Sequence, residues 1–197
     1  MPMKKIPKII SRIILLTAIS IISILFGLYI WLTQRIDNVI DKETYNHLVE
    51  EIKASEDLPE RFYEIYEQVT GFNEKSTTNK LLFYRLIQEK RNSCPCVDAS
   101  YDFGHISIDS WTVGLALDKD ASPKKCLDFS LSKYDFLYHA IGIQHASQFY
   151  YRKDIKQLSD DEMFELSVMT LNPSYYNKIR RPEELKKEVE RIKNEQE

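Results

Sequence analysis

The longest apolar run of the chain lies near its N-terminus. Residues 13–32, IILLTAISIISILFGLYIWL, contain no charged side chain. Twenty residues is about the length that a helix needs to cross the hydrocarbon of a bilayer. Tyr29 and Trp31 lie at the far end of the run, where amphipathic rings favour the membrane interface. The pattern predicts a transmembrane anchor over residues 13–32.

Beyond this run, apolar residues recur every three or four positions, which predicts a mainly α chain. Residues 33–57 continue the helical spacing and are expected to form a stalk. A helix is expected to start at Leu58-Pro59 and to end at Thr70-Gly71, because proline favours a first helical turn and glycine the position after the last one. Further helices are expected over residues 79–90, after residue 123 and after residue 181.

Capping residues predict two more helix starts. Ser159 with Glu162 three positions later matches a capping box, in which each side chain bonds to the other residue's backbone. Ser132 is expected to cap a helix that carries the apolar positions Phe136, Ala140, Ile143 and Phe149. Residues 92–105 contain Ser, Pro, Asp and Gly that interrupt any period and are expected to form a loop. Residues 106–117 fit either a strand or a helix.

Charge is placed unevenly about the apolar run. Four basic residues and no acidic residue precede it; removing those four charges from the total of −3 leaves −7 for the rest. Because cytoplasmic flanks are enriched in Lys and Arg, residues 1–12 are expected in the cytosol and the chain after residue 32 outside. A cleaved signal peptide is the alternative, although its apolar region is shorter and ends in small residues. The acidic remainder argues against a nucleic-acid partner.

The three cysteines suit an oxidising compartment. Cys94 and Cys96 are separated only by a proline, so a bridge between them is strained, and one of them is expected to pair with Cys126. Three buried, reduced thiols are the alternative. A zinc site would need a fourth ligand, and His105 does not give a typical zinc spacing, so no metal site is expected.

A longer pattern covers the second half of the chain. It comprises LALDKDASPKKCLDFSL at 115–131, GIQHASQFYYRK at 142–153, LSDDE at 158–162 and NPSYY at 172–176. In order and spacing, over about residues 106–190, it resembles glycosyltransferase family 51, the peptidoglycan glycosyltransferases. This resemblance implies one lysozyme-like helical domain, expected over residues 58–197.

The same resemblance implies a function and a location. The protein is expected in the bacterial inner membrane with its domain periplasmic, acting on or binding the lipid-linked disaccharide precursor of peptidoglycan. Partners implied are the precursor or glycan, the membrane and other wall-synthesis proteins. No cofactor is evident from the sequence, although members of the family can use a divalent cation.

The family's catalytic motifs are where this sequence departs from the pattern. The motif E-D-x-x-F-x-x-H-x-G has its nearest counterpart in Glu67 and Gly71, which makes Glu67 the candidate general base. The motif R-K-x-x-E falls on Ile106, Ser107 and Ser110, with Asp109 as a neighbouring carboxylate. The alternative is that Glu67 is a solvated helix residue. The protein would then be a non-catalytic relative that binds precursor or scaffolds other wall-synthesis enzymes.

Overall fold

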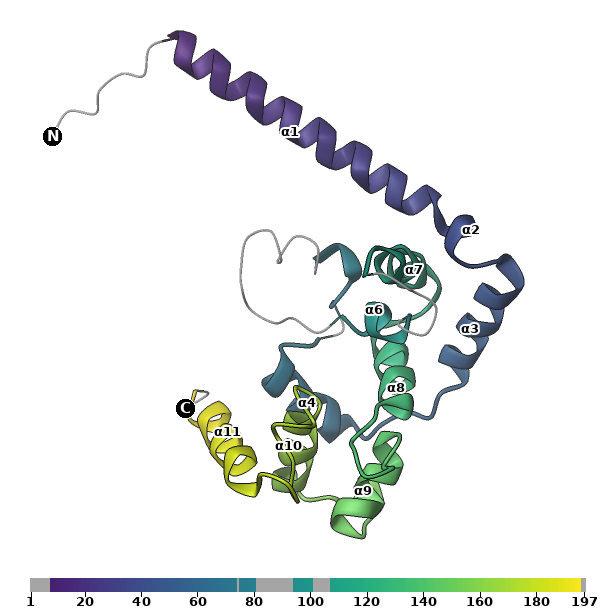
Figure 1. The fold of residues 1–197 in the computed structure, drawn as a ribbon, viewed down its shortest axis with the longest axis vertical. Helices are drawn as coiled ribbons and strands as arrows, with labels where there is room; N and C mark the ends of the chain where they lie inside the picture. The colour runs from purple at the N-terminus through teal and green to yellow at the C-terminus, as the bar shows by residue number, and fades with distance from the viewer. Residues whose placement is uncertain (1–7, 74, 81–93, 101–106, 196–197) are drawn as a thin grey trace, which may run out of the picture.

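The structure is a computed structural model that describes residues 8–73, 75–80, 94–100 and 107–195. One long helix, α1 (Lys8–Gln34), projects from a body of shorter helices (Figure 1). The described residues contain no strand, only one isolated antiparallel bridge between Asp135 and Ile141. The expected mainly helical fold with an apolar N-terminal helix is therefore confirmed. Most of the helix expected over residues 79–90 lies outside the described residues.

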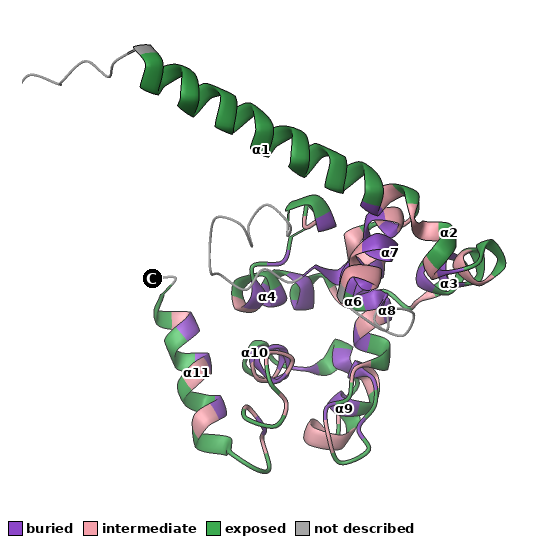
Figure 2. Ribbon diagram, turned by 45° about the horizontal axis from the view of Figure 1, so that its top comes forward, coloured by how far each residue is buried: buried purple, intermediate pink, exposed green. Residues whose placement is uncertain are grey.

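Helix α1 exposes its apolar side chains along almost its whole length (Figure 2). The stretch Ile9–Gln34 has a mean hydropathy of 2.6 and is long and apolar enough to cross a membrane. Leu32, near its end, is buried against the body. The apolar surface of α1 is therefore left uncovered by the other described residues.

Residues 33–57, expected as a stalk, pack onto the body. They form α2 (Ile36–Val39) and α3 (Lys42–Ala54), which starts at Asp41, whose carboxylate accepts the Thr44 N–H. Leu48 and Ile52 of α3 are fully buried in a hydrophobic cluster with residues of α7 (Ser107–Asp120) and α8 (Pro123–Lys133). The helical spacing of apolar residues in 33–57 therefore reflects a helix face that is buried in the body, not a free stalk.

The main core is built around α4 (Glu60–Thr70), α10 (Asp160–Met169) and α11 (Pro182–Asn194). As predicted, α4 follows Leu58-Pro59 and ends at Gly71, which adopts the left-handed conformation with φ +73°. The capping box is also confirmed, since the Ser159 hydroxyl accepts the Glu162 N–H and the Glu162 carboxylate accepts the Ser159 N–H. Local capping chemistry sets these boundaries.

The predicted helix start at Ser132 is wrong. Ser132 lies in the last turn of α8, where its hydroxyl donates to the Phe129 carbonyl. Residues 134–142 form a tight turn, closed by Phe136 N–H to Ala140 O (3.0 Å) and Gly142 N–H to Tyr134 O (2.8 Å). Helix α9 (Ile143–Tyr151) starts only after this turn. The spacing looked helical because the turn also buries Phe136 and Ala140 in the core.

Two segments differ from or resolve their expectation. Residues 106–117 fitted either a strand or a helix, and from Ser107 onward they belong to α7. Part of the expected loop at 92–105 is the short helix α6 (Pro95–Ala99), with proline in its first turn. Residues 101–105, including His105, lie outside the described residues.

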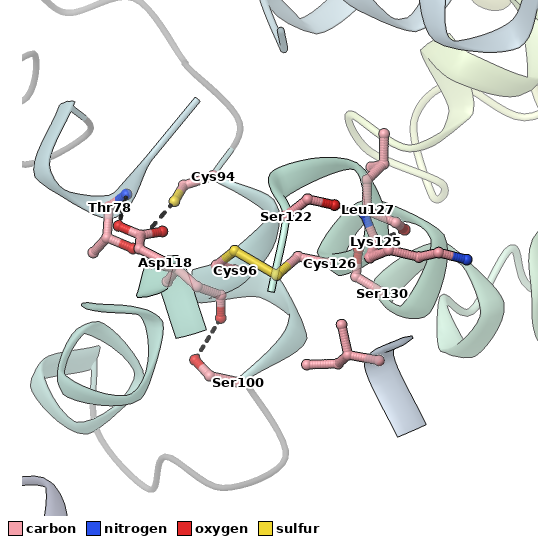
Figure 3. Close-up of a disulfide and its surroundings, with 12 residues drawn as sticks. Thr78, Cys94, Cys96, Ser100, Asp118, Ser122, Lys125, Cys126, Leu127 and Ser130 are labelled. Carbon is pink, nitrogen blue, oxygen red and sulfur yellow. Dashed lines mark hydrogen bonds between the residues drawn. A yellow bond between two sulfur atoms is a disulfide. The ribbon is translucent and has the colours of Figure 1, made fainter. Parts of the chain in front are cut away.

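A disulfide joins α6 to α8 (Figure 3). It links Cys96 to Cys126, whose Cα atoms are 5.0 Å apart, and both residues are fully buried. Cys94 is a buried free thiol. The bridge spans 30 positions of sequence, so it restricts the unfolded chain substantially.

We predict that the double substitution Cys96→Ala/Cys126→Ala lowers the free energy of unfolding by about 3–4 kcal/mol, the loop-closure entropy for a bridge of this span. The measurement is urea unfolding of the full chain in detergent micelles, followed by tryptophan fluorescence. Reductant should destabilise the native chain and the matched control Cys94→Ala, but leave the double variant unchanged. If reductant did not change the stability of Cys94→Ala, the Cys96–Cys126 pairing would be contradicted.

Candidate functional site

Glu67, the candidate general base, lies on the exposed face of α4. The opposite face buries Phe62 and Ile65 in the main core. The Glu67 side chain has no hydrogen bond or ion pair with any residue that the structure describes. It is accessible to a ligand but is not held in a fixed geometry, so its catalytic role stays a prediction.

Asp128 is the most deeply buried carboxylate among the described residues. It accepts a hydrogen bond from the Tyr63 hydroxyl (2.5 Å), and that hydroxyl accepts the Leu58 N–H (3.0 Å). The second carboxylate oxygen of Asp128 is buried without a hydrogen-bond partner. Burial raises the pKa of Asp128 to about 6, because desolvation disfavours the charged form.

Two lysines at the start of α8 contact α4 and the segment before it, close to Asp128. The Lys125 ammonium contacts Asp57 (2.9 Å) and donates to the Ser55 carbonyl (2.6 Å). Lys124 lies 4.1 Å from the centre of the Tyr63 ring. With these contacts, the Asp128–Tyr63 hydrogen bond fastens α4 to α8. Asp128 therefore has a clear structural role.

Asp118 forms a second partly buried centre, in the last part of α7 (Figure 3). Its carboxylate accepts the Thr78 N–H (2.8 Å), and burial raises its pKa. The Cys94 thiol lies 3.6 Å from the Thr78 hydroxyl, and burial raises the pKa of Cys94 to about 11. Cys94 thus stays protonated near neutral pH and is a poor nucleophile or metal ligand.

An ion pair connects the end of α1 to α7. Arg35, immediately after α1, places a guanidinium nitrogen 2.8 Å from an Asp109 carboxylate oxygen. The two side chains are only 20% and 16% exposed, and the Arg35 guanidinium lies 4.9 Å from the Trp31 ring centre. The sequence offered no cation near Asp109, and the structure brings one from 74 positions away. A pair so distant in sequence leaves no local signal.

The described residues show no group of three or more His, Cys, Asp or Glu that could hold a metal ion. His145 is exposed on α9, and His139 lies in the turn before it. Cys96 and Cys126 are unavailable as ligands because they bond to each other. The described part of the chain therefore shows no ligand set for the divalent cation that members of the family can use.

We predict that stability falls as the pH rises through the pKa of Asp128. The raised folded-state pKa stabilises the native chain below about pH 4, and this contribution is lost progressively up to about pH 6, by at most about 3 kcal/mol. In Asp128→Asn this slope should be absent from the unfolding free energies measured by urea titration between pH 4 and 7.

Asp57→Asn is the matched control. The pKa of Asp57 is lowered by its hydrogen bond to Lys125, so its contribution has the opposite sign and is lost as the pH falls. This variant should keep the decline attributed to Asp128. Equal slopes in native chain and Asp128→Asn would refute the assignment.

Comparison with known proteins gives two findings. The family described as Transglycosylase matches residues 107–197, from the start of α7 to the end of the chain. Penicillin-binding protein 1F of Bacillus subtilis (strain 168) is 31% identical over 80 residues, which are 41% of this chain. The match spans only 11% of that protein's length.

The matched segment contains the motifs on which the resemblance was based, including the capping box of α10 and the turn after it. Glu67, Arg35 and the apolar helix α1 all lie before it. The resemblance to glycosyltransferase family 51 is therefore confirmed over residues 107–197, which match the transglycosylase family model.

Proposed function

We propose that the protein is a membrane-anchored, peptidoglycan glycosyltransferase-like protein that acts on or binds the lipid-linked disaccharide precursor of the cell wall. The transglycosylase match over residues 107–197 and the similarity to a penicillin-binding protein support the peptidoglycan role. The anchor, the lipid-linked substrate and the domain limits of 58–197 are part of this proposal.

The junction of α1 with α7 is the observation that carries the proposal. Leu32 is buried against the body, and Arg35 bridges to Asp109 at the start of the transglycosylase segment. Trp31 stacks with Arg35 at the end of the apolar run, where interfacial side chains are favoured. A substrate held in the same bilayer by its own lipid would lie at the depth of α7.

Location follows from charge and from the disulfide. Residues 1–12 carry the basic excess expected of a cytosolic flank, so we place the body outside the inner membrane. The Cys96–Cys126 disulfide supports this side, because disulfides persist in the periplasm and are rare in the cytosol. Other wall-synthesis proteins are proposed partners on that side.

Binding without turnover is the second candidate function. Glu67 stands alone on the surface of α4, and Asp118 and Asp128, two carboxylates of the segment 115–131 that carries the resemblance, are engaged in bonds within the fold. Developing negative charge on a diphosphate leaving group would need a nearby cation. Glu67 has none among its described neighbours within ion-pair distance.

The test is a polymerisation assay on the full chain in detergent, with lipid-linked disaccharide as substrate. If the chain is catalytic, glycan strands form, and Glu67→Gln slows their formation by about 100-fold or more, as loss of a general base does. Glu64→Gln is the matched control, because Glu64 is exposed on the same helix. Precursor binding without strand formation would support the non-catalytic role. If the chain neither bound the precursor nor formed strands, the proposal would be overturned.

The ion pair at the membrane junction gives a separate prediction. Arg35→Glu places two carboxylates together and should reduce binding of precursor in bilayer vesicles by about tenfold. The swapped variant Arg35→Glu/Asp109→Arg should recover it. A water-soluble analogue of the precursor, which does not depend on the height of the body above the bilayer, should bind all three proteins alike. If Arg35→Glu weakened the binding of both ligands, the substitution would be disrupting the fold.

A further inference from the structure

The exposed large hydrophobic side chains outside α1 lie on only two loops of the described chain. Tyr138 (45% exposed) and Ile141 (59%) belong to the turn between α8 and α9, and Tyr175 (39%) and Ile179 (56%) to the connection between α10 and α11. We call these four residues the aromatic ledge. Single exposed apolar residues are ordinary, but four on neighbouring loops indicate a binding surface.

The two loops are fastened to each other by Tyr150 of α9. Its hydroxyl donates to the Phe136 carbonyl (2.6 Å) and accepts a hydrogen bond from the Asn177 side chain (3.0 Å). Asn177 is fully buried, and its side-chain oxygen Oδ1 accepts hydrogen bonds from the backbone N–H groups of Ile179 and Arg180. The two halves of the ledge are therefore parts of one fixed surface.

The turn that presents Tyr138 is conformationally strained. Leu137, Tyr138 and His139 all adopt positive φ, at 69°, 53° and 64°. Each such residue costs on the order of 1–2 kcal/mol and persists only where its surroundings hold it. The turn is held by the Asp135 carboxylate, which accepts the Leu137 N–H (2.8 Å). Such strain is retained most often where a surface has a function.

The ledge combines flat aromatic rings with positive charge. The Tyr138 ring stacks on Phe149, with 14° between the ring planes, which fixes its orientation. The Arg181 guanidinium lies 4.9 Å from the centre of the Tyr175 ring. Arg180 beside it is exposed and forms no ion pair with a described residue. Aromatic faces pack against the C–H faces of sugar rings, and arginine pairs with carboxylates.

Both loops lie at the end of the body away from α1 (Figure 1). A lipid surface reached by the anchor is therefore a poor occupant for the ledge. We propose that the ledge binds a carboxylate-bearing glycan strand, namely uncrosslinked peptidoglycan. This deepens the proposed function, on which the identity of the glycan rests, by adding a strand-binding surface remote from the membrane junction.

The test is calorimetric titration of the full chain in detergent micelles with soluble, uncrosslinked peptidoglycan strands. Tyr138→Ala and Tyr175→Ala should each raise the Kd about fivefold or more by removing a ring contact. Gln148→Ala, on the exposed face of α9, is the matched control and should bind like the native chain. Circular dichroism should show equal helix content in all variants.

Charge is tested with a second probe. Arg180→Ala should weaken binding of the carboxylate-bearing strands but not of uncharged chitin oligosaccharides, whereas Lys187→Ala on α11 should change neither. Ledge variants that bind strands like the native chain, or a native chain that binds no strand, would overturn the proposal. So would ledge variants that lose only self-association, since the ledge would then be a protein interface.

Lipid-linked precursor separates this proposal from the proposed function. The ledge variants should bind precursor in vesicles as the native chain does. If the chain binds precursor but the ledge variants bind strands normally, only the proposed role of the ledge is rejected. Ledge-dependent strand binding without precursor binding rejects the proposed substrate and leaves the ledge standing.

Discussion

Helix α8 is the element on which the rest of the structure depends, because it is buried on two sides. Leu127 and Leu131, four positions apart, contribute to the main core with α4 and α10. Cys126 and Phe129 contribute to the second cluster, with α3, α6 and α7. A helix so placed cannot rotate without opening one core, and the Cys96–Cys126 bridge fixes its rotation covalently. The end of the body that contacts α1 and the end away from it are coupled through α8.

Sequence patterns predicted those parts of the fold that depend on local chemistry. The ends of α4 and the start of α10 follow from Gly71 and from the Ser159–Glu162 capping box, which need only a few neighbouring residues. Ser132 shows the limit of such reasoning. A serine before an apolar spacing resembles an N-cap, but the chain folds back at Gly142, where a Cβ would collide with the Ser132 carbonyl.

Contacts between distant segments could not be predicted in the same way. Arg35 and Asp109 are each ordinary charged residues in sequence, and only the docking of α1 and α2 on α7 brings them together. Asp118 and Asp128 present the opposite case. Both lie in the segment 115–131 that carries the family resemblance, yet their burial and hydrogen bonds identify them as parts of the scaffold. Spacing alone does not separate a catalytic carboxylate from a structural one.

The link between α1, the proposed anchor, and the body has a thermodynamic consequence. A flexible linker would spread the body over a range of heights and orientations, and the effective concentration of its surfaces for a membrane-bound ligand would fall as the linker lengthened. Here α2 begins two residues after α1 ends, and Leu32 and Arg35 pack on the body. The orientation entropy is therefore already lost in the free protein, and a lipid-linked ligand does not have to supply it on binding. The aromatic ledge lies at the end of the body away from α1 (Figure 1), so a strand could contact it without displacing the proposed anchor from α7.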